Sequence, residues 1–260
     1  MTESESVTPS PKKTAAQQDN PLANILLNVL APVLILSMCS KEGESLWHIG
    51  PYKAMGLALA VPISYGIWHF IAHKKFNIFS AVGFLNVLLT GIITIYLFTA
   101  DDPKTRATAP LVFGLKEAIQ PLILGSLFLI THRSKSPLFN IFVYSEALFD
   151  HPRILKAVRE KDQELPYLKL LWSSTLLFFG SFCLSAIMNL GLAFYFLSDL
   201  DPTAANWKEL YNKDVARITG WGFLVIGVPL LLVSGFILWR MIGGLKQLTG
   251  METDEIMQAR

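Results

Sequence analysis

Charged residues are scarce in this sequence, and their scarcity limits the class of protein. Asp, Glu, Lys and Arg make up 16% of the 260 residues, whereas a soluble domain usually carries about 25%. Hydrophobic residues make up 52%, which excludes a disordered chain, because disordered chains have too little apolar surface to bury. The net charge is only +2, and no basic stripe with interleaved aromatic residues is present. A nucleic-acid partner is therefore not expected.

Cysteine and histidine are too few and too scattered to indicate a reactive site. Cys39 and Cys183 are the two cysteines, and without a C-x-x-C pair or a Cys/His cluster they predict neither a disulfide framework nor a zinc site. The sequence also lacks the G-x-S-x-G, Walker, G-x-G-x-x-G and H-E-x-x-H motifs. It therefore predicts a protein that is not an enzyme and that needs no metal or cofactor.

The apolar residues are gathered into six long blocks. A helix needs about 20 apolar residues to cross the hydrocarbon core of a membrane, and open strands leave backbone groups unsatisfied there. No alternating ten-residue pattern indicates a barrel. The sequence thus predicts an all-α membrane protein with six transmembrane helices, at residues 22–38, 53–72, 77–99, 110–130, 167–197 and 220–241.

The distribution of lysine and arginine predicts the orientation. We expect residues 1–20 to form a disordered cytoplasmic tail, residues 21–245 the six-helix domain, and residues 246–260 a C-terminal cytoplasmic tail. Of the 22 Lys and Arg residues, 14 lie in segments that are cytoplasmic if both termini are inside, and 7 lie in the outer loops. Lys116 lies within a span. This bias favours cytoplasmic termini.

Residues 137–164 form the one sizeable segment outside the predicted spans. The segment begins with an apolar stretch that includes Phe139, Phe142 and Phe149, and Asp150 is placed to cap the helix that follows. We interpret it as a cytoplasmic helical segment that lies in the membrane interface. A loop packed on the helix bundle is the alternative.

A lysine and a glutamate lie inside the fourth predicted span. A buried unpaired charge costs at least ~2.5 kcal/mol, and Lys116 and Glu117 lie roughly 9 Å beyond the start of the span. As neighbours they point about 100° apart on a helix, so we expect each to find a partner on another span, or water, rather than to form a mutual pair. Gln120 extends the polar face by one turn. The alternative is that the span starts later and both charges reach the outer interface.

Two prolines suggest an internal repeat. Pro32 and Pro121 each remove a backbone donor four residues after a polar side chain, Asn28 and Glu117 respectively. Copies that are three spans apart insert with opposite orientation, as in an inverted three-plus-three repeat. Prolines are common in membrane helices, so a chance match is an equal alternative.

The fifth predicted span carries small polar side chains on one face. Ser174, Ser181, Ser185 and Asn189 follow one another at spacings of seven, four and four residues, which places them on the same side of a helix. The serines favour close helix packing. The asparagines cost more to bury, and both packing and a lined cavity remain open for them.

Several short strings of the sequence are distinctive as a set. They are Asn20-Pro21-Leu22 through residue 34, Leu115-Lys116-Glu117-Ala118 to Pro121-Leu122, Ser181-Phe182 through Ser185 to Asn189 and Ala193, and Trp207-Lys208-Glu209-Leu210. The chain resembles, in these strings, a group of uncharacterised bacterial inner-membrane proteins that is similar to the intracellular septation protein A family. The resemblance covers most of residues 20–250. It implies a multi-pass protein of the bacterial cytoplasmic membrane linked to envelope upkeep or division, and it brings no catalytic residues. The basic loop at residues 131–166 has no counterpart in the septation family.

Two hypotheses for function follow. The first is a small carrier or lipid-handling protein whose intramembrane site binds an anionic lipid or solute, with Lys116 attracting a phosphate and Glu117 exchanging a proton. The alternative is a non-transporting scaffold that binds envelope or division proteins. A cavity at Lys116 would favour the first, and a solid bundle the second. The candidate substrate-binding residues are Asn28, Lys116, Glu117, Gln120 and Asn189, with Pro32 and Pro121 as helix-breaking residues.

Overall fold

Helices make up most of the described chain. The computed structural model describes residues 26–43, 45–73, 78–100 and 102–257. Within these ranges there are two isolated β-bridges and no strand, so the all-α class is confirmed. The elements are the π-helical η1 (Leu26–Leu30), α2 (Ala31–Cys39), α3 (Pro51–His73), α4 (Ile78–Thr99), α5 (Pro103–Ala107), α6 (Ala109–Thr131), α7 (Leu138–Phe142), α8 (His151–Glu160), α9 (Glu164–Leu197), α10 (Trp207–Gly222), the π-helical η2 (Phe223–Gly227), α11 (Val228–Thr249) and α12 (Thr253–Ile256).

Among the described residues, three helices are long and apolar enough to cross a membrane. They are α6, α9 and the continuous helix Trp207–Thr249, which is formed by α10, η2 and α11. They contain 23, 34 and 43 residues, and therefore measure about 34, 51 and 64 Å. Because a hydrocarbon core is about 30 Å thick, α9 and the 43-residue helix are long enough to extend beyond it. The chain thus has helices typical of a membrane protein.

The last long helix begins earlier than the sequence predicts. It starts at Trp207 rather than near residue 220. The first half of this helix carries charged residues, among them Lys213, Asp214 and Arg217. Hydropathy therefore leaves it out of the predicted membrane span. That half is held instead by a buried stripe, which consists of Trp207, Tyr211, Val215 and Ile218. The sequence spacing of these residues is typical of one helix face.

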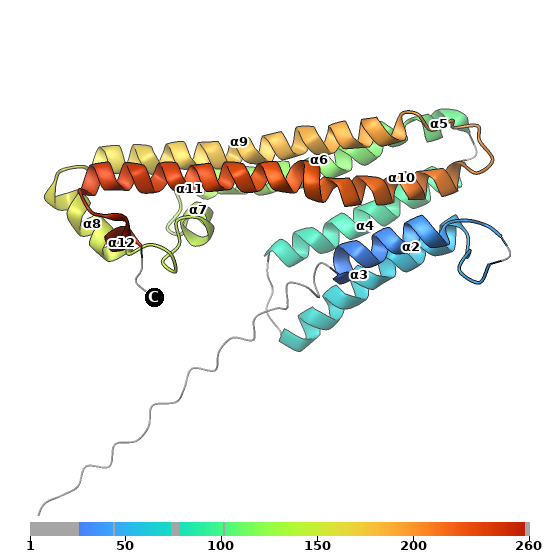
Figure 1. Ribbon diagram of the computed structural model, residues 1–260, viewed down its shortest axis with the longest axis horizontal. Helices are drawn as coiled ribbons and strands as arrows, with labels where there is room; N and C mark the ends of the chain where they lie inside the picture. Colours follow the sequence, from blue (N-terminus) through green and yellow to red (C-terminus); the bar gives the residue numbers. More distant parts are fainter. Residues whose placement is uncertain (1–25, 44, 74–77, 101, 258–260) are drawn as a thin grey trace, which may run out of the picture.

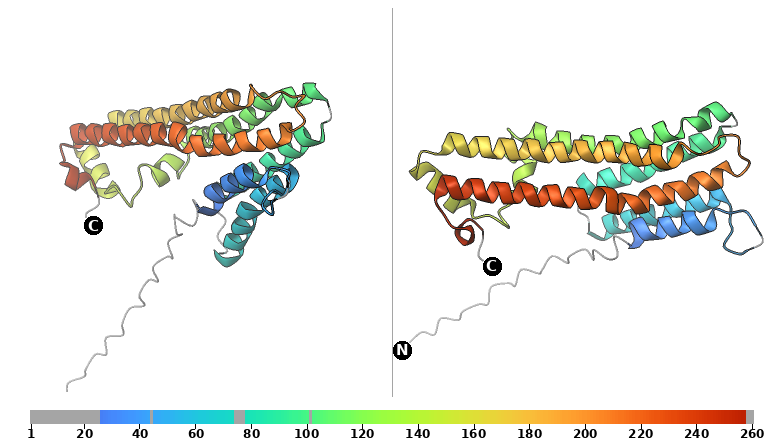
Figure 2. Two further views of the ribbon diagram at one scale, coloured as in Figure 1. Left: turned by 45° about the vertical axis from the view of Figure 1, so that its right-hand side comes forward. Right: turned by 45° about the horizontal axis from the view of Figure 1, so that its top comes forward.

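The long helices lie side by side, and shorter segments pack at the ends. α6, α9 and α10–α11 run along the long axis, α2 to α4 lie beside the α10 half, and α8 and α12 lie at the opposite end (Figures 1 and 2). The connections at residues 40–50, α5 and residues 198–206 share one end (Figure 1). There Arg106 donates a hydrogen bond to the carbonyl oxygen of Pro202 at 3.4 Å, and Lys208 donates one to the hydroxyl of Tyr52. The three connections predicted to lie outside the membrane are therefore at the same end of the molecule.

Small residues on α6 allow α9 to pack closely against it. A Cβ atom added at Gly114 would lie 2.8 Å from Leu190 Cδ1, and one added at Gly125 would lie 2.8 Å from Phe182 Cβ. On the facing helix, Ser181 and Ser185 are buried. Close approach through small residues is a common basis of helix packing in membranes. The burial of the serines supports the packing interpretation of this stripe.

The helices respond differently to their prolines. The π-helical segments η1 and η2 come directly before Pro32 and Pro229, as expected where a proline removes a backbone donor and strains the preceding turn. In contrast, α6 continues as an α-helix through Pro121. The predicted break at Pro121 is therefore absent, and Pro32 and Pro121, the two prolines that suggested an inverted repeat, have different local geometry.

The segment 137–164 packs on the protein itself. The aromatic side chains expected to enter lipid are largely inside, with Phe139 0% and Phe149 1% exposed, whereas Phe142 is 46% exposed. They pack with the ends of α9 and α11 and with α12 in a cluster that includes Tyr144, Ile154, Val158, Tyr167, Met241, Leu245 and Ile256. We call α7, α8 and α12 with this cluster the terminal cap. The alternative of a segment packed on the bundle thus describes these two phenylalanines correctly.

Backbone turns and caps hold the terminal cap in place. The side chain of Asp150 accepts a hydrogen bond from the backbone N–H of Arg153 at 3.1 Å, which confirms the predicted helix cap. The chain reverses after α11 at Gly250, where φ is 68°, a conformation that glycine adopts without steric cost. The backbone N–H of Asp150 then donates to the carbonyl oxygen of Ile256 at 2.9 Å. The end of the described chain is thereby joined to the start of α8.

Candidate functional site

Lys116 is a buried cation in the first third of α6, and it has three kinds of partner. Its side chain is 2% exposed. Its Nζ donates to Thr90 Oγ1 on α4 at 2.7 Å, forms an ion pair with Glu117 Oε1 at 2.5 Å, and lies 4.8 Å from the centroid of the Phe113 ring. Buried charges are tolerated when they are paired and hydrogen-bonded in this way. The ammonium is thus compensated within the protein.

The pairing of Lys116 with Glu117 contradicts the expectation from their positions on the helix. Adjacent residues point about 100° apart, which predicts that each binds another helix, or water, rather than its neighbour. The lysine stem is long and flexible, however, so the ammonium reaches sideways to the neighbouring carboxylate. The expected partner on another helix is present as well, because Thr90 belongs to α4.

Further polar groups from α4 and α10 lie around this ion pair. Asn86, Thr90 and Thr94 follow one another at four-residue spacings along α4, and the Thr94 hydroxyl is close to that of Tyr211 on α10. Within the described chain, Asn86 Oδ1, Thr94 Oγ1 and Tyr211 Oη are buried without a hydrogen-bond partner. We call this set the polar cluster; its members are Asn86, Thr90, Thr94, Lys116, Glu117 and Tyr211.

The remaining predicted residues do not join the polar cluster through any described contact. Gln120 is half-buried on α6. Asn189 lies at nearly the level of Lys116, because Leu190 faces Gly114. Its amide nevertheless donates to its own helix, to Ser185 O at 2.8 Å and Ser185 Oγ at 3.3 Å. Asn28 belongs to η1, but its side chain is outside the described part of the structure. Of the five candidates, the structure therefore joins only Lys116 and Glu117.

Tyr211 is a member of the polar cluster that the hydropathy of the sequence does not predict, and it is fully buried. Tyr211 lies in the polar stretch before the predicted last span, so its contribution to the bundle was not expected. A signal was present in the sequence, because Trp207, Tyr211, Val215 and Ile218 recur at spacings of four, four and three residues. This pattern indicates an amphipathic helix with one buried face.

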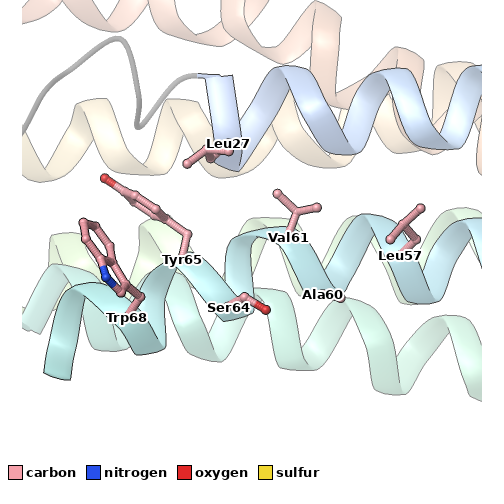
Figure 3. Close-up of a pocket in the computed structure, with 7 residues that line it drawn as sticks. All are labelled: Leu27, Leu57, Ala60, Val61, Ser64, Tyr65 and Trp68. Carbon is pink, nitrogen blue, oxygen red and sulfur yellow. The ribbon is translucent and has the colours of Figure 1, made fainter. Parts of the chain in front are cut away.

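Two hollows in the described part of the structure lie between helices and away from the polar cluster. The first has a volume of about 420 Å³ and lies between η1 and α3. In Figure 3, Leu27 of η1 points toward α3, while Tyr65, Val61 and Leu57 of α3 point toward the blue helix formed by η1 and α2. Its lining consists of Leu27, Leu57, Ala60, Val61, Ser64, Tyr65 and Trp68. It is therefore an apolar, open hollow bounded by neighbouring helices.

A second hollow of about 340 Å³ lies between α2 and α10–η2. Neither of these two hollows is lined by a residue of the polar cluster. Within the described ranges, no three His, Cys, Asp or Glu side chains are placed to hold a metal ion. The polar cluster thus has the geometry of a compensated buried ion pair, while the hollows offer apolar surface.

Comparison of the chain with protein-family models, with curated proteins and with solved structures found no match.

Proposed function

We propose that this chain is an integral membrane protein that handles lipid along its sides. The observation that carries the proposal is the open hollow between η1 and α3, whose lining is almost entirely apolar and whose volume is about 420 Å³. Lys116, by contrast, is already paired with Glu117. These two features favour binding of acyl chains between helices over passage of a solute beside Lys116.

The proposal includes six membrane crossings with both termini on the cytoplasmic side of a bacterial inner membrane. It is supported by the lengths of α3 and α4, 23 and 22 residues, which correspond to about 33–35 Å each. The shared end of the three expected outer connections also supports it. Similarity to septation protein A relatives remains a prediction from the short sequence strings.

One uncharged stretch supports a proposed position for the membrane. Arg217 and Arg240 are separated by 22 uncharged residues, or about 33 Å of helix. Arg240 donates to Ser173 Oγ at 3.1 Å, and His132 lies 3.2 Å from Thr175 Oγ1, so His132 is near the inner boundary. Lys116 is 16 residues before His132, about 24 Å away along α6. The polar cluster is thus proposed to lie in the outer part of the membrane rather than at the midplane.

The proposed topology predicts opposite sides for Lys104 and Thr253. In a Cys39→Ser, Cys183→Ser background, Lys104→Cys should react with a membrane-impermeant maleimide added to intact spheroplasts, whose membrane has its native orientation. Thr253→Cys should react only after the membrane is permeabilised. Both positions are outside the long helices, so the label reports the side directly. Labelling of both positions in intact spheroplasts would exclude the six-crossing arrangement.

The lipid-handling function predicts that filling the first hollow removes bound lipid. Ala60→Trp places an indole in the hollow and should lower the lipid that co-purifies with the protein several-fold, measured by quantitative mass spectrometry. Ile67→Trp is the matched control, because Ile67 is on the same helix, is 49% exposed and does not line the hollow. Equal lipid content in wild type and Ala60→Trp would contradict the proposal.

A non-transporting scaffold is the second candidate function, and the terminal cap favours it. The cap is a packed unit at one end of the long helices, with Phe139, Phe149 and Ile256 at 0–1% exposure. A rigid unit of this kind offers a fixed surface to envelope or division proteins. The lipid measurement separates the two candidates, because a scaffold needs no lipid in the hollow.

A further inference from the structure

The hollow between α2 and α10–η2 combines cations with apolar surface. Its lining includes Val33 and Ser37 on α2, Lys213, Arg217 and Trp221 on α10, and Leu224 on η2. Its volume is about 340 Å³, and it is open on one side. We call it the basic groove.

Polarity changes in one direction along the basic groove. Asn212 donates to Ser40 Oγ at 3.0 Å, which fixes the end of α2 against the start of α10. From there toward the uncharged stretch, α10 and η2 present first Lys213 and Arg217 and then Trp221 and Leu224. On α2, Ser37 comes first and Val33 lies one turn further. Both walls therefore pass from polar to apolar in the same direction, as a lipid does from headgroup to chain.

The charged end of the basic groove carries an excess of positive charge. Arg217 Nη1 is 2.8 Å from Asp214 Oδ1, and the Arg217 side chain is 51% exposed while that of Asp214 is 10% exposed. Lys213 is exposed and makes no ion pair with the described part of the chain. Two cations therefore face one carboxylate. Such a site attracts a net negative headgroup more strongly than a zwitterionic one, whose ammonium finds only the carboxylate that Arg217 already holds.

We propose that the basic groove binds one anionic phospholipid. Lys213 and Arg217 contact the phosphate, and an acyl chain lies along Val33, Trp221 and Leu224. Arg217 is the last charged residue before the uncharged stretch, so its guanidinium is at the depth where a lipid phosphate meets the hydrocarbon. This inference deepens the proposed lipid-handling function and rests on it, while naming a separate groove and a headgroup class.

Native mass spectrometry of the full-length protein tests the inference. Phosphatidylglycerol and phosphatidylcholine with identical chains are titrated separately, and bound lipid is counted per protein. Wild type should prefer phosphatidylglycerol. The double variant Lys213→Gln, Arg217→Gln should have a lower affinity for phosphatidylglycerol than wild type, by about fivefold for each cation removed. Because the double change leaves Asp214 without its partner, Lys213→Gln alone is the second variant, with an expected loss of about fivefold.

Two further variants separate a groove from general surface charge. Lys41→Gln with Lys104→Gln removes two exposed cations at the same end of the molecule and should leave the preference unchanged. Gly220 lines the groove, and a Cβ added there meets nothing within 4 Å. Gly220→Leu should therefore narrow the groove and weaken binding of both lipids.

The outcomes distinguish the inference from the proposed function. An unchanged phosphatidylglycerol preference in Lys213→Gln and in the double variant overturns the basic groove but leaves lipid handling in place. No lipid retained by wild type overturns the proposed function itself. If the double variant instead converts a dimer to a monomer with unchanged lipid binding, the groove holds a second copy of the chain, and the lipid inference is wrong.

Discussion

Glu117→Gln should lower the free energy of unfolding by about 3 kcal/mol, because it leaves a buried ammonium without its counter-charge. The Lys116 side chain is 2% exposed, and after this change it retains only the Thr90 hydroxyl and the Phe113 ring. Lys116→Met should cost less, because the Glu117 side chain is 21% exposed and reaches water or a proton more easily. The double variant should cost less than Glu117→Gln, since it removes both charges together.

Denaturant unfolding of the detergent-purified protein measures these differences as a double-mutant cycle. Lys156 and Glu160 form the control pair on α8, with side chains 77% and 64% exposed and a distance of 3.8 Å. An exposed i,i+4 pair is worth only about 0.3–0.5 kcal/mol, so Lys156→Met and Glu160→Gln should have small effects. A loss in the double variant equal to the sum of the two single losses would show that Lys116 and Glu117 do not act as a pair.

Gly114→Ala and Gly125→Ala should each destabilise the protein by about 1–3 kcal/mol, because an added methyl group forces α6 and α9 apart. The neighbours of the added Cβ at Gly125 are 2.8 Å and 3.1 Å away, at Phe182 Cβ and Phe179 Cδ2. At Gly114 they are Leu190 Cδ1 at 2.8 Å and Ala193 Cβ at 3.0 Å. The phenylalanine contact involves an atom fixed to the backbone, so rotation of the side chain does not relieve it.

Glycine-to-alanine changes on α9, outside its contact with α6, should change the stability in the opposite direction. Gly180→Ala and Gly191→Ala lie within α9, where an added Cβ meets nothing within 4 Å. Alanine is about 0.5–1 kcal/mol more favourable than glycine within a helix. These two variants should therefore raise the unfolding midpoint, while Gly114→Ala and Gly125→Ala lower it. Four changes of one sign would mean that helix propensity, rather than the α6–α9 contact, determines the effect.

Hydrophobic patterning predicts the helices of this protein well, but it misplaces their ends when charge is present. The apolar blocks give α3, α4 and α6 to within a few residues. They miss most of α10, because its buried stripe is interleaved with charged residues such as Lys213 and Arg217. When one face of a helix is apolar and the other is charged, the mean hydropathy of the segment is near zero. Only the periodicity of the buried residues then identifies the helix.

The sequence predicts which charged residues of the candidate site are buried, but it does not predict which side chains they contact. Burial of Lys116 follows from its depth in an apolar block, but its pairing depends on the path of the side chain rather than the direction of its Cα–Cβ bond. The role of Tyr211 depends on α4 and α10, two helices that are far apart in the sequence. Neither the lateral hollows nor the burial of Phe139 follows from local pattern, because both depend on which helices become neighbours.

The π-helical turn η2 keeps the two halves of the longest helix in phase. Ile218 and Ile237, buried in α10 and α11, are 19 positions apart, which in an unbroken α-helix places them about 100° apart around the axis. A π-helical turn accommodates about one extra residue, and it thereby rotates the second half back by a similar angle. One rod of 43 residues can then present a single seam to α9 from the connection at residues 198–206 to the terminal cap. The angular register between the two ends of the molecule thus depends on one widened turn beside Pro229.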